Sequence, residues 1–326
     1  MARERILSGM RPTGPLHLGH LFGALENWAR LQETYDCFFM VADWHALMSE
    51  YEDPRDLRRN GRETVRDWVA CGIDPAKSVI FLQSAVPEHL ELSMIFSAIT
   101  PLPWLERCPT YKEQLREVKG RDLTTYGFLG YPVLQAADIA VYRAHKVPVG
   151  VDQLPHLELT REIVRRFHFF YKKEIFPEPE PLMTEVPKLL GLDNRKMSKS
   201  FGNYIALSDT PEEIRRKVAQ MITDPARQKL SDKGHPDLCN VFSYYKVFGD
   251  KQIVADVRVW CEGAAKGCTE CKKILAEKVV ERLSGIRAKR ASLTDAAVED
   301  ILNEGNKKAA AAARETLRLV KELVFP

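Results

Sequence analysis

The chain contains 326 residues with a net charge of +3, and 45% of them are hydrophobic and 29% charged. This length can bury a sizeable core and is typical of two domains in an ordinary globular protein. No apolar run approaches the roughly 18 residues that a membrane span needs, and the first residues show no secretory signal. We therefore expect a cytoplasmic protein with no membrane partner, whose small net charge leaves any nucleic-acid contact to local basic patches.

The first 170 residues alternate between strand-like and helix-like segments. Helical patterns cover residues 18–35 and 54–71. Because Pro148 cannot donate a backbone hydrogen bond, we expect the strand that contains it to end there or to lie at an edge. The alternation is typical of an α/β fold with a doubly wound, Rossmann-type parallel sheet and helices on both faces. The predicted strands are the apolar runs at residues 5–9, 37–42, 78–83 and 147–151.

From about residue 210 onward the pattern becomes mainly helical. Thr210 is expected to cap a helix that begins at Pro211, and residues 306–324 predict one terminal helix. Two domains follow, an α/β domain over residues 1–205 and an α-helical domain over residues 206–326. The terminal helix is the element of the second domain that could pack back on the first.

Polar side chains follow three of the predicted strands. His17 and His20 come after the first strand, His45 after the second, and Asp152 and Gln153 after the fourth. In parallel sheets ligands bind beyond the carboxyl ends of the strands, so these side chains are candidates for one site. Asp152 could instead cap the amphipathic helix predicted over the following residues.

Two short motifs together indicate a nucleotide site. In Gly14–His20, two imidazoles flank a glycine near a helix start, where they can donate to phosphate oxygens. In Arg195–Asn203, Lys196 and Lys199 lie in a loop rich in serine and glycine, which suits a clamp for a triphosphate. Either motif alone is compatible with a capped helix or a solvated basic loop. Both together, in this order, resemble the paired signatures of the class I aminoacyl-tRNA synthetases, which implies that they bind ATP.

A polar and aromatic stripe runs along a third helical segment. Tyr131, Gln135, Asp138 and Tyr142 are spaced four, three and four residues apart, which places them on one helix face. Asp138 could accept a hydrogen bond from a planar substrate, and Tyr131 could form a wall of its pocket. A half-exposed helix face would show the same spacing.

Four cysteines near the C-terminus have the spacing C-x21-C-x6-C-x2-C, and they are Cys239, Cys261, Cys268 and Cys271. Four thiolates can complete a tetrahedral zinc site or hold an iron–sulfur cluster. The final C-x2-C pair favours a metal over four unrelated thiols. The spacing alone does not choose between zinc and iron.

Beyond these motifs, the chain resembles the bacterial tryptophanyl-tRNA synthetases, which are class I aminoacyl-tRNA synthetases. The resemblance runs essentially end to end and is carried by residues 7–14, 41–47, 130–139, 150–153, 158–163 and 221–227 as well as by the two motifs. It implies activation of L-tryptophan with ATP and Mg²⁺ to an enzyme-bound adenylate, followed by transfer to the terminal adenosine of tRNA(Trp). It also implies a homodimer, with a catalytic domain over residues 1–205 and an anticodon-binding domain over residues 206–326.

The resemblance implies a role for each site residue. Asp138 would accept the indole N–H. The other residues expected at the amino-acid pocket are Leu7, His45, Tyr131, Gln135, Val147, Val149, Asp152 and Gln153. The residues expected to hold ATP are Gly9, Met10, Arg11, Thr13, His17, Gly19, His20, Lys196, Met197, Ser198 and Lys199. The expected catalytic residues are His17, His20, Lys196 and Lys199, with the lysines stabilising the pentavalent phosphate and the departing pyrophosphate.

A subset of the family carries a [4Fe–4S] cluster on four cysteines, with a first gap one residue longer than here. We therefore expect a [4Fe–4S] cluster on Cys239, Cys261, Cys268 and Cys271, with Zn²⁺ as the alternative. Two other positions depart from the family pattern. Gln135 stands where many relatives have methionine, and Val151 stands where glutamate is frequent.

Three other functions compete with this interpretation. Tyrosyl-tRNA synthetases share the fold and both motifs, and Asp138 alone does not distinguish indole from phenol. A non-catalytic paralogue that binds amino acid or RNA would be expected to lack the histidines or lysines, which are all present. A related nucleotidyltransferase, such as a pantothenate-forming ligase, would not need the helical, cysteine-bearing C-terminal region.

Overall fold

The computed structural model describes residues 3–108, 122–183, 189–199 and 201–326. The chain forms two compact units. The first comprises residues 1–13, 27–184 and 294–326, and the second comprises residues 14–26 and 185–293. The predicted division into a catalytic domain over residues 1–205 and an anticodon-binding domain over residues 206–326 concerns function, and it stays a prediction. Among the described residues, no helix is both long enough and apolar enough to cross a membrane.

The first unit is built on five parallel strands in the order β3-β2-β1-β4-β5. They are β1 (Arg5–Met10), β2 (Asp36–Val41), β3 (Ser78–Leu82), β4 (Lys146–Val149) and β5 (Glu180–Met183). The first four confirm the predicted strands. β5 was not predicted, because it contains Pro181 and its side chains are mostly exposed. Pro148 lies one residue before the end of β4, which pairs on both sides, so the alternative of an edge strand is wrong.

Both faces of this sheet are covered by helices, as predicted for a doubly wound fold. Successive residues of a strand point to opposite faces, and β2 shows this clearly. Phe39 stacks on Trp28 of α2 (Glu26–Leu31), with ring centroids 4.6 Å apart. Phe38 packs on the other face against Tyr142, at the end of α8 (Tyr126–Val141), with centroids 4.8 Å apart.

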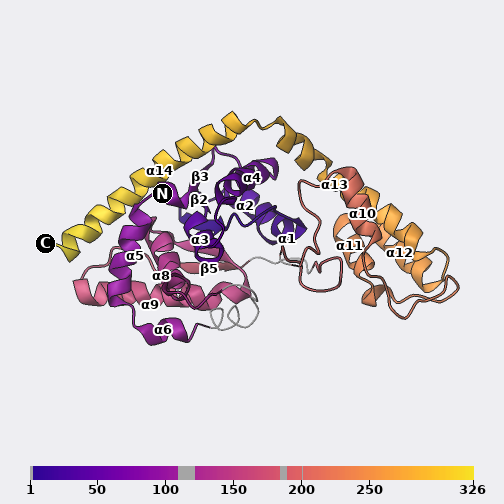
Figure 1. Cartoon of the computed structure of the whole chain (residues 1–326), viewed down its shortest axis with the longest axis horizontal. Helices are drawn as coiled ribbons and strands as arrows, with labels where there is room; N and C mark the ends of the chain where they lie inside the picture. The colour runs from indigo at the N-terminus through magenta and orange to yellow at the C-terminus, as the bar shows by residue number, and fades with distance from the viewer. Residues whose placement is uncertain (1–2, 109–121, 184–188, 200) are drawn as a thin grey trace. The chain divides into compact units, whose positions relative to one another are not determined.

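The other helices of the first unit surround this core. α5 packs against α8, and α8 packs against α9, so these three lie together beside the sheet (Figure 1). The predicted helix over residues 54–71 is confirmed as α4. The remaining helices of this unit are α3 (Asp43–Glu50), α4 (Leu57–Ala70), α5 (Glu88–Ile99), α6 (Leu102–Glu106), α9 (Leu154–Tyr171) and α14 (Asp295–Val324).

The terminal helix α14 covers the edge strand β3. It begins at Asp295, where the Thr294 side chain caps it, eleven residues before the predicted start at residue 306. Gly305 approaches β3 so closely that an added Cβ would lie 1.7 Å from the carbonyl oxygen of Ile80. The next residue, Asn306, accepts a hydrogen bond from the backbone N–H of Leu82 at 2.9 Å. An edge strand exposes unpaired backbone groups, and α14 covers this one.

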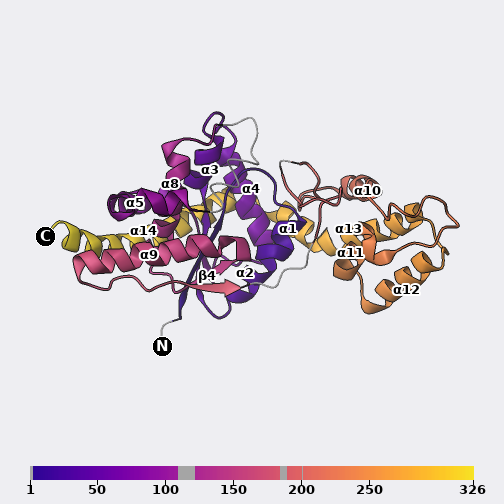
Figure 2. The same ribbon diagram turned by 90° about the horizontal axis from the view of Figure 1, so that it is seen from below.

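The second unit is mainly helical (Figure 2). Its helices are α1 (Leu18–His20), a π-helical turn (Leu21–Leu25), α10 (Pro211–Ala219), α11 (Asn240–Phe248), α12 (Lys251–Glu262) and α13 (Cys268–Ser292). Thr210 and Glu213 form a reciprocal capping box at the start of α10, which confirms the predicted cap. The single helix predicted over residues 18–35 is wrong in detail, because the π turn divides it and α2 ends at Leu31.

The contact between Gly305 and β3 predicts a sharp response to one added methyl group. Gly305→Ala should lower the free energy of unfolding by about 1–3 kcal/mol, because backbone atoms of β3 block the new Cβ. Thermal or urea unfolding measures the change. The matched control is Gly285→Ala in α13, where an added Cβ meets nothing within 4 Å. That control should gain up to about 1 kcal/mol from helix propensity. Equal effects at both positions would contradict the close packing of α14.

Candidate active site

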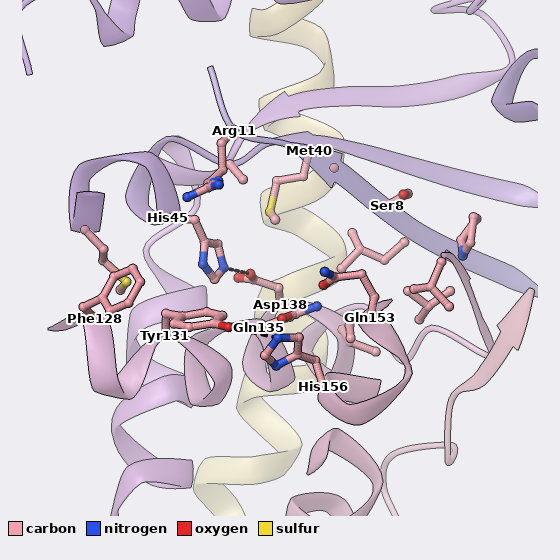
Figure 3. A pocket seen from close by; sticks show the side chains of 18 residues that line it. Ser8, Arg11, Met40, His45, Phe128, Tyr131, Gln135, Asp138, Gln153 and His156 are labelled. Atoms are coloured by element: carbon pink, nitrogen blue, oxygen red, sulfur yellow. Dashed lines mark hydrogen bonds and ion pairs between the residues drawn. The ribbon is translucent and has the colours of Figure 1, made fainter. Parts of the chain in front are cut away.

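A cavity of about 310 Å³ lies in the first unit, beyond the carboxyl ends of β1, β2 and β4 (Figure 3). α8 and α9 complete its walls. Eight of the nine residues predicted for the amino-acid pocket, all except Asp152, line it together: Leu7, His45, Tyr131, Gln135, Asp138, Val147, Val149 and Gln153. Gly9 and Arg11, which were predicted to hold ATP, also line it, at the end of β1. Several lining residues were not predicted: Ser8, Met40, Ala42, Met48, Phe128, Ile139, Pro148 and His156.

Asp138 is the most constrained side chain of this cavity. Its carboxylate is buried on α8 and receives three hydrogen bonds. Oδ2 is 2.7 Å from Nε2 of His45, and Oδ1 is 2.7 Å from Nδ1 of His89 and 2.8 Å from Nε2 of Gln83. Burial opposes ionisation, but the charge and hydrogen bonds of His45 and His89 outweigh it and hold the pKa of Asp138 at about 2. The group is therefore a carboxylate that can only accept.

A carboxylate offers about four lone-pair directions, two on each oxygen. On Asp138, Gln83 and His89 use both directions of Oδ1, and His45 uses one of Oδ2. In the part of the chain that the structure describes, no further donor contacts the oxygen that His45 contacts, and Figure 3 shows His45 and Asp138 side by side at the cavity. The cavity thus has in its wall a buried carboxylate with one acceptor direction left.

A second chain of contacts, which the sequence did not predict, joins Tyr131 and His156 of the cavity lining to Cys108. The Tyr131 hydroxyl is 2.9 Å from Nε2 of His156, and Nδ1 of His156 is 3.4 Å from Sγ of Cys108. Burial lowers the pKa of His156 to about 4, so its ring is neutral near pH 7. His156 lies one helical turn after Gln153 on α9, and that spacing is the only local signal that could have found it.

Gln153 and Asp152 have different surroundings. Gln153 lines the cavity, whereas Asp152 is exposed and is not among its lining residues. Gln153 Nε2 donates to Asp152 Oδ2 at 3.0 Å. The alternative reading of Asp152 as the helix cap is wrong, because α9 begins after Gln153 without a side-chain cap. Val151, where relatives often have glutamate, is exposed as well.

The two histidines of the first motif lie in the second unit with fixed ring orientations. Nδ1 of His17 accepts from the backbone N–H of Gly19, and Nδ1 of His20 accepts from that of His17, both at 3.1 Å. Burial and the charge of Lys199 lower the pKa of His17 to about 4, and burial places that of His20 well below its ordinary value. Both rings are neutral with Nε2 protonated, so each can donate one hydrogen bond.

The lysine motif lies beside the histidine motif in the same unit. Lys199 Nζ donates to the carbonyl oxygen of Gly14 at 2.9 Å, and an added Cβ on Gly19 would lie 3.5 Å from the sulfur of Met197. The chain pairs in an antiparallel bridge between His17 and Ala206. Ser200, within the second motif, lies outside the described residues. The remaining predicted ATP residues, Gly9, Met10, Arg11 and Thr13, belong to the first unit.

The four cysteines predicted to hold a metal line one small hollow of about 30 Å³ in the second unit. They are near enough that the charges of the others raise the pKa of Cys271, although burial is the main reason why it reaches about 11. An added Cβ on Gly234 would lie 2.4 Å from Sγ of Cys261, so the backbone approaches that sulfur closely. In the described part of the chain, no three His, Cys, Asp or Glu side chains are arranged to hold a metal ion as they stand.

Comparison with known proteins adds independent findings. Residues 2–284 match the family of class I tRNA synthetases for tryptophan and tyrosine (W and Y). The chain is 51% identical to a tryptophan–tRNA ligase of Thermotoga maritima, over 97% of this chain and 98% of that one. A tryptophan–tRNA ligase of Aquifex aeolicus is 43% identical, with 98% of each chain covered.

A solved structure agrees with these relatives. Tryptophanyl-tRNA synthetase of Campylobacter jejuni, crystallised with ADP and tryptophan, superposes with a TM-score of 0.90 at 33% identity. The match covers 98% of this chain and 99% of that one. The fold, the two motifs and these similarities agree, and the chain belongs to the class I aminoacyl-tRNA synthetases of the tryptophan and tyrosine family.

Proposed function

We propose that this protein is a tryptophan–tRNA ligase. It forms tryptophanyl-adenylate and pyrophosphate from L-tryptophan and ATP, and then transfers tryptophan to the 3′-terminal adenosine of tRNA(Trp). The observation that carries the choice of amino acid is the single open acceptor of Asp138 in a cavity of about 310 Å³. Relatives that are 51% and 43% identical over nearly their whole length carry the same name.

Asp138 accepts the indole N–H in this proposal. The pocket offers the ring one buried carboxylate oxygen, and aromatic and aliphatic side chains surround it. A substrate that donates one hydrogen bond at its ring edge satisfies that oxygen, whereas an apolar ring leaves it unpaired at a cost of about 1–3 kcal/mol. Gln153, Tyr131 and Gln135 are among the polar side chains of the lining that could contact the ammonium and carboxylate of the amino acid.

Activation needs no base from the protein. A tryptophan carboxylate oxygen attacks the α-phosphorus of ATP, the bond to the bridging oxygen breaks, and pyrophosphate leaves with the electron pair. Neutral His17 and His20 donate through Nε2 to phosphate oxygens, because their Nδ1 atoms are occupied as acceptors. Lys196 and Lys199 stabilise the negative charge that gathers on the leaving pyrophosphate. Mg²⁺ accompanies the ATP as its counter-ion.

The remaining predicted ATP contacts are Gly9, Met10, Arg11, Thr13, Gly19, Met197 and Ser198. Residues 1–205 act as the catalytic domain and residues 206–326 as the anticodon-binding domain in this proposal. The protein works as a homodimer in the cytoplasm, where its tRNA substrate is charged. The family's shared architecture supports these assignments.

The four cysteines hold a [4Fe–4S] cluster in this proposal, with Zn²⁺ as the alternative. The support is that all four line one hollow in the second unit, with the backbone of Gly234 packed against Cys261. Thiolates crowded together repel one another, and a bound cation removes that repulsion. Burial raises the pKa of Cys261 and of Cys271, so metal binding at these two thiols has to release protons.

The test of the function is ATP–pyrophosphate exchange with each of the twenty amino acids. We expect exchange with tryptophan alone, because only its side chain combines the size of the cavity with one ring-edge donor. Charging of tRNA(Trp) transcript should follow with the same amino acid. Exchange with tyrosine would overturn the pocket assignment but keep the chemistry. Exchange with no amino acid, from folded protein, would favour the non-catalytic paralogue.

The metal proposal predicts iron and acid-labile sulfide in equal amounts in protein purified without oxygen. Cys271→Ser should lose most of that iron, because a hydroxyl is a poor ligand for the cluster. Cys71→Ser, at a cysteine outside the hollow, is the matched control and should keep the wild-type iron content. Zinc without sulfide would support the alternative. Neither metal in the wild-type protein would contradict both.

A further inference from the structure

The base of the lysine-bearing loop is held by two buried side chains of α11, within the second unit. Nδ2 of Asn240 donates to the carbonyl oxygen of Gly191, and the Tyr244 hydroxyl donates to that of Leu190, both at 2.7 Å. Asn240 is 3% exposed and Tyr244 is fully buried. Buried hydrogen bonds of this length from well-packed side chains fix the position of the backbone that accepts them.

This part of the backbone leads directly to Lys196. Leu190 pairs with Lys196 in an antiparallel bridge, and the Gly191 N–H donates to the carbonyl oxygen of Arg195 at 2.7 Å. The two carbonyl groups that accept hydrogen bonds from α11 therefore belong to Leu190 and Gly191, whose other contacts position the first residues of the lysine motif. A shift of Leu190 and Gly191 moves Lys196 with them.

The other end of the loop is fastened by Asn203. Its Oδ1 accepts from the Ser198 N–H at 2.9 Å, and its Nδ2 donates to the Lys196 carbonyl oxygen at 3.1 Å. The Leu192 N–H donates to the Asn203 carbonyl oxygen at 2.8 Å, which joins the two ends. These hydrogen bonds join the two ends of the loop, and the hydrogen bonds from Asn240 and Tyr244 of α11 fix its base within the second unit.

The same helix contacts the four-cysteine hollow on another side. α11 begins directly after Cys239, which is one of the residues that line the hollow. The hydroxyl of Tyr245 donates to the carbonyl oxygen of Cys271 at 2.7 Å. Tyr244 and Tyr245 are thus adjacent and both fully buried, and each donates one hydrogen bond of 2.7 Å to a backbone carbonyl group. Tyr244 contacts the base of the lysine loop, whereas Tyr245 contacts the cysteine segment.

We propose that Asn240 and Tyr244 are positioning residues for the activation step, which hold Lys196 and Lys199 where the pyrophosphate leaves. Neither side chain is among those that line the cavity of the first unit. Asn240 and Tyr244 act through the backbone of Leu190 and Gly191. Loss of either side chain therefore leaves the tryptophan pocket unchanged but allows the lysine loop to change its position. The inference rests on the proposed function, because it assumes that the loop stabilises a transition state.

The two tyrosines provide a matched test by ATP–pyrophosphate exchange with tryptophan. Tyr244→Phe should lower kcat about five- to tenfold, the range expected for one lost hydrogen bond, with KM for tryptophan within about twofold of wild type. Tyr245→Phe loses an equally buried hydroxyl and should lower the unfolding temperature by a similar amount, but keep kcat within about twofold. Wild-type kcat in Tyr244→Phe, or an equal loss of kcat in both variants, would overturn the proposal.

Amide hydrogen exchange gives a readout that does not depend on activity. In Tyr244→Phe the amides of Gly191 and Ser198 should exchange faster than in wild type. In Tyr245→Phe the same two amides should exchange at the wild-type rate. Unchanged protection in Tyr244→Phe would also overturn the proposal. If wild-type protein shows no exchange activity with tryptophan, the proposed function fails by itself, and the amide comparison still decides whether α11 holds the loop.

Discussion

The amino-acid site depends on one buried carboxylate. Asp138 lies on α8, and its charge is tolerable inside the protein only because groups from three other segments donate to it. His45 follows β2, Gln83 follows β3 and His89 lies on α5, so the hydrogen bonds to Asp138 hold the segments after two strands and one helix close together. The same three hydrogen bonds fix the orientation of the carboxylate and leave one of its acceptor directions free. In the proposed function, this free acceptor direction is what selects a substrate with a ring-edge donor.

The nucleotide motifs depend on a different principle, the positioning of neutral and cationic donors on a small framework. His17 and His20 are kept neutral by burial and oriented by backbone N–H groups. The lysine loop is closed by Asn203 and held at its base by α11. Donors fixed in this way need not reorganise when charge develops in the transition state. The histidines and the lysine loop are therefore both held in place by hydrogen bonds within the second unit, as their proposed contacts with phosphate would require.

The sequence predicted those elements whose signal is local. Strands β1 to β4 are apolar runs, and the cap at Thr210 is a motif of four residues. β5 was missed because an exposed strand with a proline has no such run. Asp138 was found on its helical stripe, but its partners Gln83 and His89 are 55 and 49 residues away, and nothing local marks them. The start of α14 at Asp295 was also missed, although Thr294 caps it locally; its packing on β3 joins distant parts of the chain and has no local signal.

The central claim is that the open acceptor of Asp138 selects the indole N–H. The most direct measurement compares kcat/KM of ATP–pyrophosphate exchange for tryptophan and for an analogue whose ring N–H is replaced by sulfur. We expect kcat/KM to fall by about ten- to a hundredfold for the analogue, because its ring leaves the buried oxygen unpaired at a cost of about 1–3 kcal/mol. Equal efficiency with both substrates would contradict it.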